Sequence, residues 1–200
     1  MLKLGEILFK FRDYTPIPFV IVMIIYSAAD MNSLIAGTCI TIFGELIRMI
    51  GVSHIGGVSR TKTYSTGQKL ITSGPFSYVR NPLYIGNFFL TGGLVVASNI
   101  YIAEIPKSNV LFTVVFIAFF ILQYTPIIRW EENNLRNIFG AEFETYVKQV
   151  PRWIPAIIPK IKKQETIKGD LKAAIFSEKN TLMAAILMYV LILWRSGWLY

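Results

Sequence analysis

The sequence predicts an all-α protein that crosses a membrane about five times. Hydrophobic residues make up 54% of its 200 residues and charged residues only 16%, which is too apolar for an ordinary soluble domain of this size. The apolar residues gather in uncharged runs that approach the roughly 20 residues a helix needs to cross a bilayer. Because backbone in lipid must satisfy its own hydrogen bonds, these runs are predicted to be helices. A soluble protein with unusually apolar core helices is the less favoured alternative.

The helices can be taken in chain order. Residues 1–13 predict a short amphipathic helix on the membrane surface, where apolar side chains are interleaved with Lys3, Lys10 and Arg12. Five predicted spans follow, of which the first is the shortest and weakest. They cover residues 14–29, 32–52, 82–102, 110–128 and 181–200. Function is expected in the two long polar segments between them, residues 53–81 and 129–180, because long ordered loops on one face of a scaffold commonly carry it.

The net charge of +8 is distributed unevenly. If the N-terminus is cytoplasmic, every Lys and Arg except Lys107 and Arg195 falls on the cytoplasmic side of the predicted spans. The positive-inside rule therefore predicts that the N-terminus and both long polar segments are cytoplasmic. Beside so many spans, the basic surface is expected to contact anionic lipid headgroups rather than nucleic acid. Residues 161–179, which are basic and patchily apolar, are expected to lie along the inner surface.

Few residues suited to metal or thiol chemistry are present. The chain has one cysteine, Cys39, and one histidine, His54, so it forms no internal disulfide and lacks the usual ligands of a zinc site. No P-loop or nucleophile elbow occurs. Within the second span, Glu45 and Arg48 are spaced to pair on one helix face. The chain is expected to form a single membrane domain over residues 1–200.

The first polar segment ends in a helix start. Ser73-Gly74-Pro75 is a turn signal. Asn81 precedes Pro82 and is therefore biased toward an extended conformation, while Pro82 suits the first turn of the third span. The free amides of that turn favour an anion or a carboxylate, with Arg80 beside them and Tyr84 one turn further on. An ordinary helix start with an interfacial Arg and Tyr accounts for the same pattern equally well.

The second polar segment opens with two adjacent carboxylates, Glu131 and Glu132. At the C-terminal end of a helix they would oppose its dipole, so the helix is predicted to continue to about residue 139 and to end at Gly140. A second helix is predicted over 141–150. Its apolar stripe is expected to pack on the spans or the lipid surface, and consists of Phe139, Phe143, Tyr146 and Val150. A solvated carboxylate pair balanced by nearby arginines is the alternative reading of Glu131 and Glu132.

Together the two segments resemble the isoprenylcysteine carboxyl methyltransferases and the related phospholipid N-methyltransferases. The first matching motif is Leu70-Ile71-Thr72-Ser73-Gly74-Pro75-Phe76 followed by Tyr78-Val79-Arg80-Asn81-Pro82-Leu83-Tyr84-Ile85-Gly86-Asn87. The second is Glu131-Glu132, Leu135, Phe139-Gly140-Ala141-Glu142-Phe143, Tyr146 and Val150-Pro151-Arg152. The resemblance covers residues 51–155, about half the chain. It implies a membrane methyltransferase that uses S-adenosylmethionine.

The resemblance also implies roles for individual positions. The residues expected to line the cofactor pocket are Gln68, Lys69, Leu70, Ile71, Phe76, Asn81, Pro82, Leu83, Tyr84 and Glu131. Arg129 is the nearest match to an arginine that contacts the substrate. The chemistry of the cofactor, rather than the resemblance, suggests that Arg80 or the start of the third span holds its carboxylate, and that Glu132 is a possible base if the acceptor is an amine. Many members of the family have His where this chain has Asn81.

The predicted activity is methyl transfer to a lipid or isoprenoid-type acceptor at the cytoplasmic membrane face. The acceptor group is left open among carboxyl, amine and phenol, and a homodimer is also left open. Two other functions compete with this one. A sterol-reductase-like enzyme would use NADPH, whereas a small transporter or membrane scaffold would carry inward-facing charges at mid-membrane, for which Glu45 is the clear candidate.

Overall fold

The computed structural model describes residues 2–55, 69–159, 161 and 169–199. Regular structure within this part of the chain is entirely helical, as the sequence predicts. The helices are α1 Leu2–Phe11, α2 Ile17–Tyr26, α3 Met31–Ile55, the 3-10 turn η2 Gly74–Ser77, α4 Pro82–Ser98, α5 Ser108–Phe139, α6 Ala141–Gln149 and α7 Leu171–Arg195. Gln68, the first predicted cofactor contact, lies outside the described residues.

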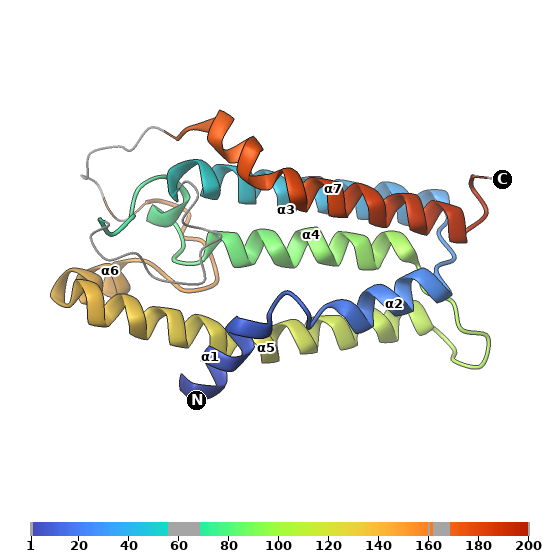
Figure 1. Ribbon diagram of the computed structural model, residues 1–200, viewed down its shortest axis with the longest axis horizontal. Coiled ribbons are helices and arrows are strands. Elements are labelled where there is room, and N and C mark those ends of the chain that lie inside the picture. Colours follow the sequence, from blue (N-terminus) through green and yellow to red (C-terminus); the bar gives the residue numbers. More distant parts are fainter. Residues whose placement is uncertain (1, 56–68, 160, 162–168, 200) are drawn as a thin grey trace.

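Four long helices, α3, α4, α5 and α7, run side by side along the long axis of the molecule (Figure 1). Three of them, α3, α5 and α7, are long and apolar enough to cross a membrane. Helices α4 and α2 are apolar but shorter, with 17 and 10 residues. At 1.5 Å per residue α2 is roughly 15 Å long, which is about half of a hydrocarbon core. Among the helices at the five predicted spans, the one at the weakest prediction is therefore the shortest.

Helices α3 and α4 pack with their backbones almost in contact. A Cβ atom added to Gly44 would lie 2.3 Å from the Leu90 amide nitrogen, and one added to Gly93 would lie 2.5 Å from the Thr41 nitrogen. Small residues permit such close approach between membrane helices, where packing replaces the hydrophobic effect as the source of association. The close packing of α3 against α4 holds α4, and with it the start of that helix, in place.

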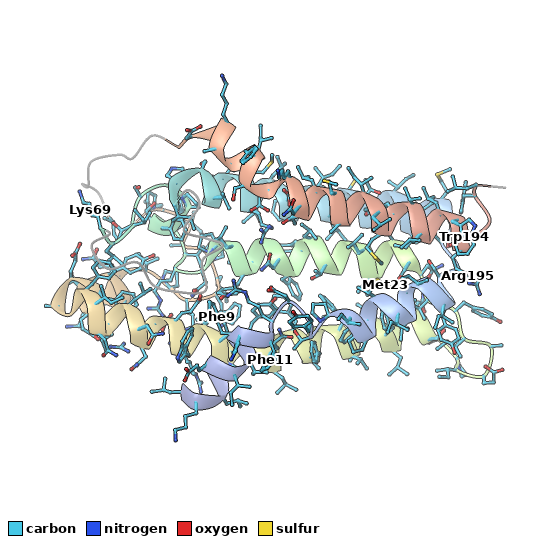
Figure 2. The ribbon with its side chains drawn as sticks, viewed as in Figure 1. Phe9, Phe11, Met23, Lys69, Trp194 and Arg195 are labelled. Carbon is cyan, nitrogen blue, oxygen red and sulfur yellow. The ribbon has the colours of Figure 1, made fainter. Side chains whose placement is uncertain are left out.

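Helix α7 differs from its prediction at the beginning. Residues 171–179, expected on the membrane surface, form its first turns instead. Asp170 caps the helix, because its Oδ1 accepts a hydrogen bond of 3.0 Å from the Ala173 amide. At the other end, Trp198 Nε1 donates to the Ala29 carbonyl at 2.9 Å. Figure 1 shows α7 running beside α3, and Figure 2 shows Trp194 and Arg195 at the end of the molecule opposite Lys69.

Candidate functional site

The start of α4 is fixed by the segment that follows α6. Asn81 is the N-cap residue and Pro82 is the first helical residue, as predicted. The Arg80 amide donates to the Pro151 carbonyl at 2.9 Å, and Asn81 Nδ2 donates to the Arg152 carbonyl at 3.2 Å. These bonds join the two polar segments directly, at the positions of their sequence motifs.

Tyr84 and Glu131 join α4 to α5. The Tyr84 hydroxyl donates to Glu131 Oε2 at 2.8 Å, and the Tyr84 ring lies 5.0 Å from the ring of Tyr124. The two carboxylates are not at the end of a helix, because α5 continues to Phe139 and ends at Gly140. Gly140 has a φ of 50°, which favours glycine at a helix end. The predicted helix extension is confirmed, and it places Glu131 against the first turn of α4.

Glu132 is paired with two arginines. Only 4% of the residue is exposed. Arg152 binds it through two hydrogen bonds, Nε to Oε1 at 3.0 Å and Nη2 to Oε2 at 2.6 Å, while Arg80 Nε lies 3.1 Å from Oε1. Burial lowers the pKa of Arg80, and the hydrogen bond with Glu132 raises the pKa of Arg152. Charge-assisted bidentate contacts such as that of Arg152 are strong and directional, and Arg80 forms an ion pair with the same carboxylate.

Helix α6 packs against the first polar segment. The apolar cluster at this contact consists of Leu70, Phe143, Tyr146 and Val150, with Phe139 at its edge. The Tyr146 hydroxyl donates to the Phe76 carbonyl at 2.9 Å, and burial raises the pKa of Tyr146. Among the predicted cofactor residues, Leu70 is thus buried in this cluster, whereas Ile71 is half-buried and Lys69 is exposed. Leu83 faces Gly51 of α3.

Arg129 lies at an exposed position of α5, and its predicted contact with the substrate stays a prediction. Arg80 and Arg152 make ion pairs with Glu132. Arg152 was missed as a site residue, although it belongs to the second motif.

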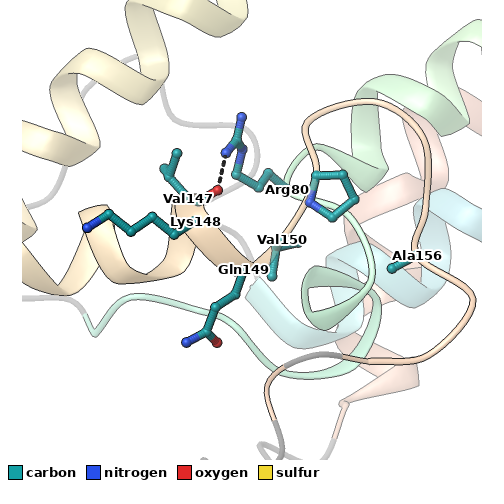
Figure 3. A pocket seen from close by; sticks show the side chains of 7 residues that line it. Arg80, Val147, Lys148, Gln149, Val150 and Ala156 are labelled. Atoms are coloured by element: carbon teal, nitrogen blue, oxygen red, sulfur yellow. Dashed lines mark hydrogen bonds between the residues drawn. The ribbon is translucent and has the colours of Figure 1, made fainter.

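A cavity of about 510 Å³ lies behind the arginine cluster, against the end of α6. Its lining consists of Arg80, Val147, Lys148, Gln149, Val150, Pro151 and Ala156. Figure 3 shows the hydrogen bond from Arg80 Nη1 to the Val147 carbonyl, which measures 3.0 Å. Of the predicted site residues that the structure describes, only Arg80 lines this cavity, and Tyr84 and Glu131 are not part of its lining.

A second buried charge cluster links three helices. The predicted pairing of Glu45 with Arg48 is present, with 3.8 Å between Oε2 and Nε. Arg48 also contacts Glu178 of α7, with 2.6 Å between Nη2 and Oε2, and Asn87 of α4. Glu178 is completely buried. Sequence spacing revealed the local pair but not its partner on α7.

Residues 32–142, more than half of the chain, match the phospholipid methyltransferase family. The chain belongs to this family. A probable protein-S-isoprenylcysteine O-methyltransferase of Oryza sativa subsp. indica is 35% identical over 128 residues, which are 60% of each chain. The protein-S-isoprenylcysteine O-methyltransferase of Schizosaccharomyces pombe is 34% identical over 105 residues, covering 52% of this chain and 39% of the relative.

A relative with a different description also matches. The cobalt-zinc-cadmium resistance protein CzcN of Cupriavidus metallidurans is 31% identical over 126 residues, covering 60% of this chain and 53% of that protein. The chain spans about 60% of the length of the rice relatives that it matches. No solved structure matches. The family and the apolar helices together identify a helical membrane protein.

Proposed function

We propose that this protein is an S-adenosylmethionine-dependent methyltransferase acting on a lipid or isoprenoid-type acceptor at the cytoplasmic membrane face. One observation carries the proposal. The two motif segments meet through the Tyr84–Glu131 hydrogen bond of 2.8 Å, beside the Glu132–Arg80–Arg152 cluster. In a member of the phospholipid methyltransferase family, this junction of a carboxylate, aromatic rings and arginines suits a small molecule with charges of both signs.

The residue types fit the parts of that cofactor. Glu131 is held by the neutral hydroxyl of Tyr84, so its carboxylate can attract the cationic ammonium or bind the ribose hydroxyls. The amides at the start of α4, next to Arg80, suit the carboxylate. Phe76 and Tyr84 offer aromatic faces for the adenine or the sulfonium. When bound, the cofactor supplies an electrophilic methyl group.

Glu132 is better suited to positioning than to accepting a proton. Both of its oxygens already face guanidinium groups, and such charge-assisted contacts are strong and directional. These contacts occupy the carboxylate that would have to approach an amine acceptor. We therefore assign Glu132 the role of holding Arg80 and Arg152 against the ends of the two segments.

Catalysis by these residues would rest on alignment and exclusion of water. Methyl transfer is an in-line displacement, so holding donor and acceptor in line can supply much of the rate enhancement. The polar cofactor would enter from the cytoplasm. The acceptor would enter sideways from the bilayer, since α5, which carries Glu131, exposes many apolar side chains along its length.

Binding of S-adenosylmethionine to the purified protein, measured by calorimetry, tests this proposal. We expect Glu131→Ala to weaken binding by about tenfold or more, which corresponds to about 1.4 kcal/mol, since it removes a charge-assisted contact. Glu142→Ala is the matched control, because Glu142 is an exposed carboxylate on α6. Absence of binding, or equal binding by wild type and Glu131→Ala, would contradict the proposal. NADPH binding in its place would favour the reductase alternative.

A further inference from the structure

Residues 153–158, which follow α6 and Arg152, form an apolar loop that is held beside the site. Pro151 and Arg152 accept hydrogen bonds from the Arg80 amide and from Asn81, and the Ala156 amide donates to the Tyr78 carbonyl at 2.9 Å. Prolines at 151, 155 and 159 further restrict the backbone. The outward direction of the side chains in this loop is therefore fixed by the fold.

Three isoleucines project from this loop. Ile154 is 80% exposed, Ile157 is 97% exposed and Ile158 is 69% exposed. Leu122, on the apolar helix α5, is 73% exposed. The exposed fractions of the three isoleucines are therefore similar to that of an apolar side chain on a candidate membrane span. Exposed apolar clusters on a soluble surface are unfavourable and usually mark a contact surface. An ordered backbone that holds three isoleucines outward indicates an apolar environment.

The position of the loop in the fold indicates which apolar environment surrounds the three isoleucines. Arg152 contacts Asn81, the residue immediately before the apolar helix α4, and Trp153 packs against the core of the helix bundle. Helix α1 crosses α5 near the same level, where Gly5 approaches Pro126 and Phe9 lies 4.8 Å from Trp130. The outer face of α1 is also apolar, with Leu4, Ile7 and Phe11 about half exposed. Two apolar surfaces thus flank the end of the bundle.

We propose that the loop of residues 153–158 inserts Ile154, Ile157 and Ile158 into the edge of the bilayer beside the site. The occupant of this surface is lipid rather than a protein partner. In the sequence the loop is bounded by Arg152 and Lys160, with Lys162 and Lys163 directly after, and such a basic border suits anionic headgroups around an apolar insertion. The pattern matches that of an interfacial anchor.

Insertion would set the depth of the polar site. Arg152 is the first residue before the loop and holds Glu132 through two hydrogen bonds. A loop anchored in the bilayer would therefore keep the arginine cluster at the membrane surface, next to the place where a lipid acceptor would arrive. The depth of the loop does not depend on the reaction, so it can be tested separately from the proposed activity.

A depth measurement with single-cysteine variants tests the insertion. Ile157→Cys, made together with Cys39→Ser, is labelled with an environment-sensitive fluorophore and reconstituted in vesicles of phosphatidylcholine and phosphatidylglycerol. We expect blue-shifted emission, strong quenching by nitroxide-labelled lipid and little quenching by iodide. Glu142→Cys in the same background is the matched control, and its label on the exposed side of α6 should show the opposite quenching. Ile154→Cys provides a second reporter if Ile157→Cys folds poorly.

Two results would overturn this inference. Iodide quenching at both Ile157→Cys and Ile154→Cys that equals the quenching at Glu142→Cys would place the loop in water. The second result is blue-shifted emission that nitroxide-labelled lipid does not quench. If this emission also reverts to the aqueous value as the protein is diluted, a second copy of the protein covers the isoleucines. Loss of cofactor binding would leave both quenching results unaffected.

Discussion

At the scale of residues, two adjacent carboxylates have different surroundings. Glu131 is bound by a tyrosine hydroxyl, whereas Glu132 is bound by two arginines. A glutamate facing a neutral group can receive a cationic ligand, while one already neutralised by guanidinium groups contributes to the framework. The sequence predicted both as site residues but could not separate these roles, because the arginines lie 52 residues before and 20 residues after Glu132.

Glu132→Gln should destabilise the protein because it leaves Arg80 and Arg152 without their shared counter-charge. Breaking a buried ion pair by removing one partner costs about 3–5 kcal/mol, and we expect the lower end because Arg152 is one-third exposed. Thermal unfolding in detergent measures the effect. The control is Glu144→Gln, whose pair with Arg136 is exposed and should change stability by about 1 kcal/mol or less. Similar melting temperatures for both variants would contradict the assignment of Glu132 to the framework.

At the scale of elements, α7 is held to α3 and α4 by charge as well as by apolar packing. Glu178 is completely buried against Arg48, whose guanidinium also faces Glu45 and Asn87. A buried cluster of this kind requires all its members, because any one left without its partners pays the full cost of desolvation. This cluster holds the first part of α7 against α3 and α4, whereas the basic sequence of residues 171–179 predicted a position on the membrane surface.

Replacing Arg48 should therefore be more damaging than replacing Glu178. Arg48→Met leaves two buried carboxylates without their guanidinium, at a cost of about 3 kcal/mol or more, while Glu178→Gln leaves Arg48 with Glu45. Comparison of the melting temperatures of the two variants in the same detergent tests this order. An equal or larger decrease for Glu178→Gln would show that Arg48 does not bridge the three helices.

At the scale of the whole molecule, the features that the sequence predicted correctly are those that a few neighbouring residues determine. The helix start at Pro82 and the helix end at Gly140 follow from the residues at those positions, and both are confirmed. Contacts between segments that lie far apart in the chain were harder to predict from the sequence. Arg152 and Glu178 each act on a residue in another part of the chain, and no local spacing predicts such a partner. The arrangement of the spans across the membrane, with the site on the cytoplasmic side, stays a prediction from the distribution of charge.

The most direct test of the account is to identify a methylated product. Membranes containing the protein are incubated with S-adenosylmethionine that carries an isotopically labelled methyl group, and the lipids are extracted and analysed by mass spectrometry. We expect a labelled lipid from membranes with the wild-type protein, and little or none from membranes with Glu131→Ala at equal protein content. No labelled lipid in either sample, or the same amount in both, would contradict the claim that the two polar segments form a methyl-transfer site.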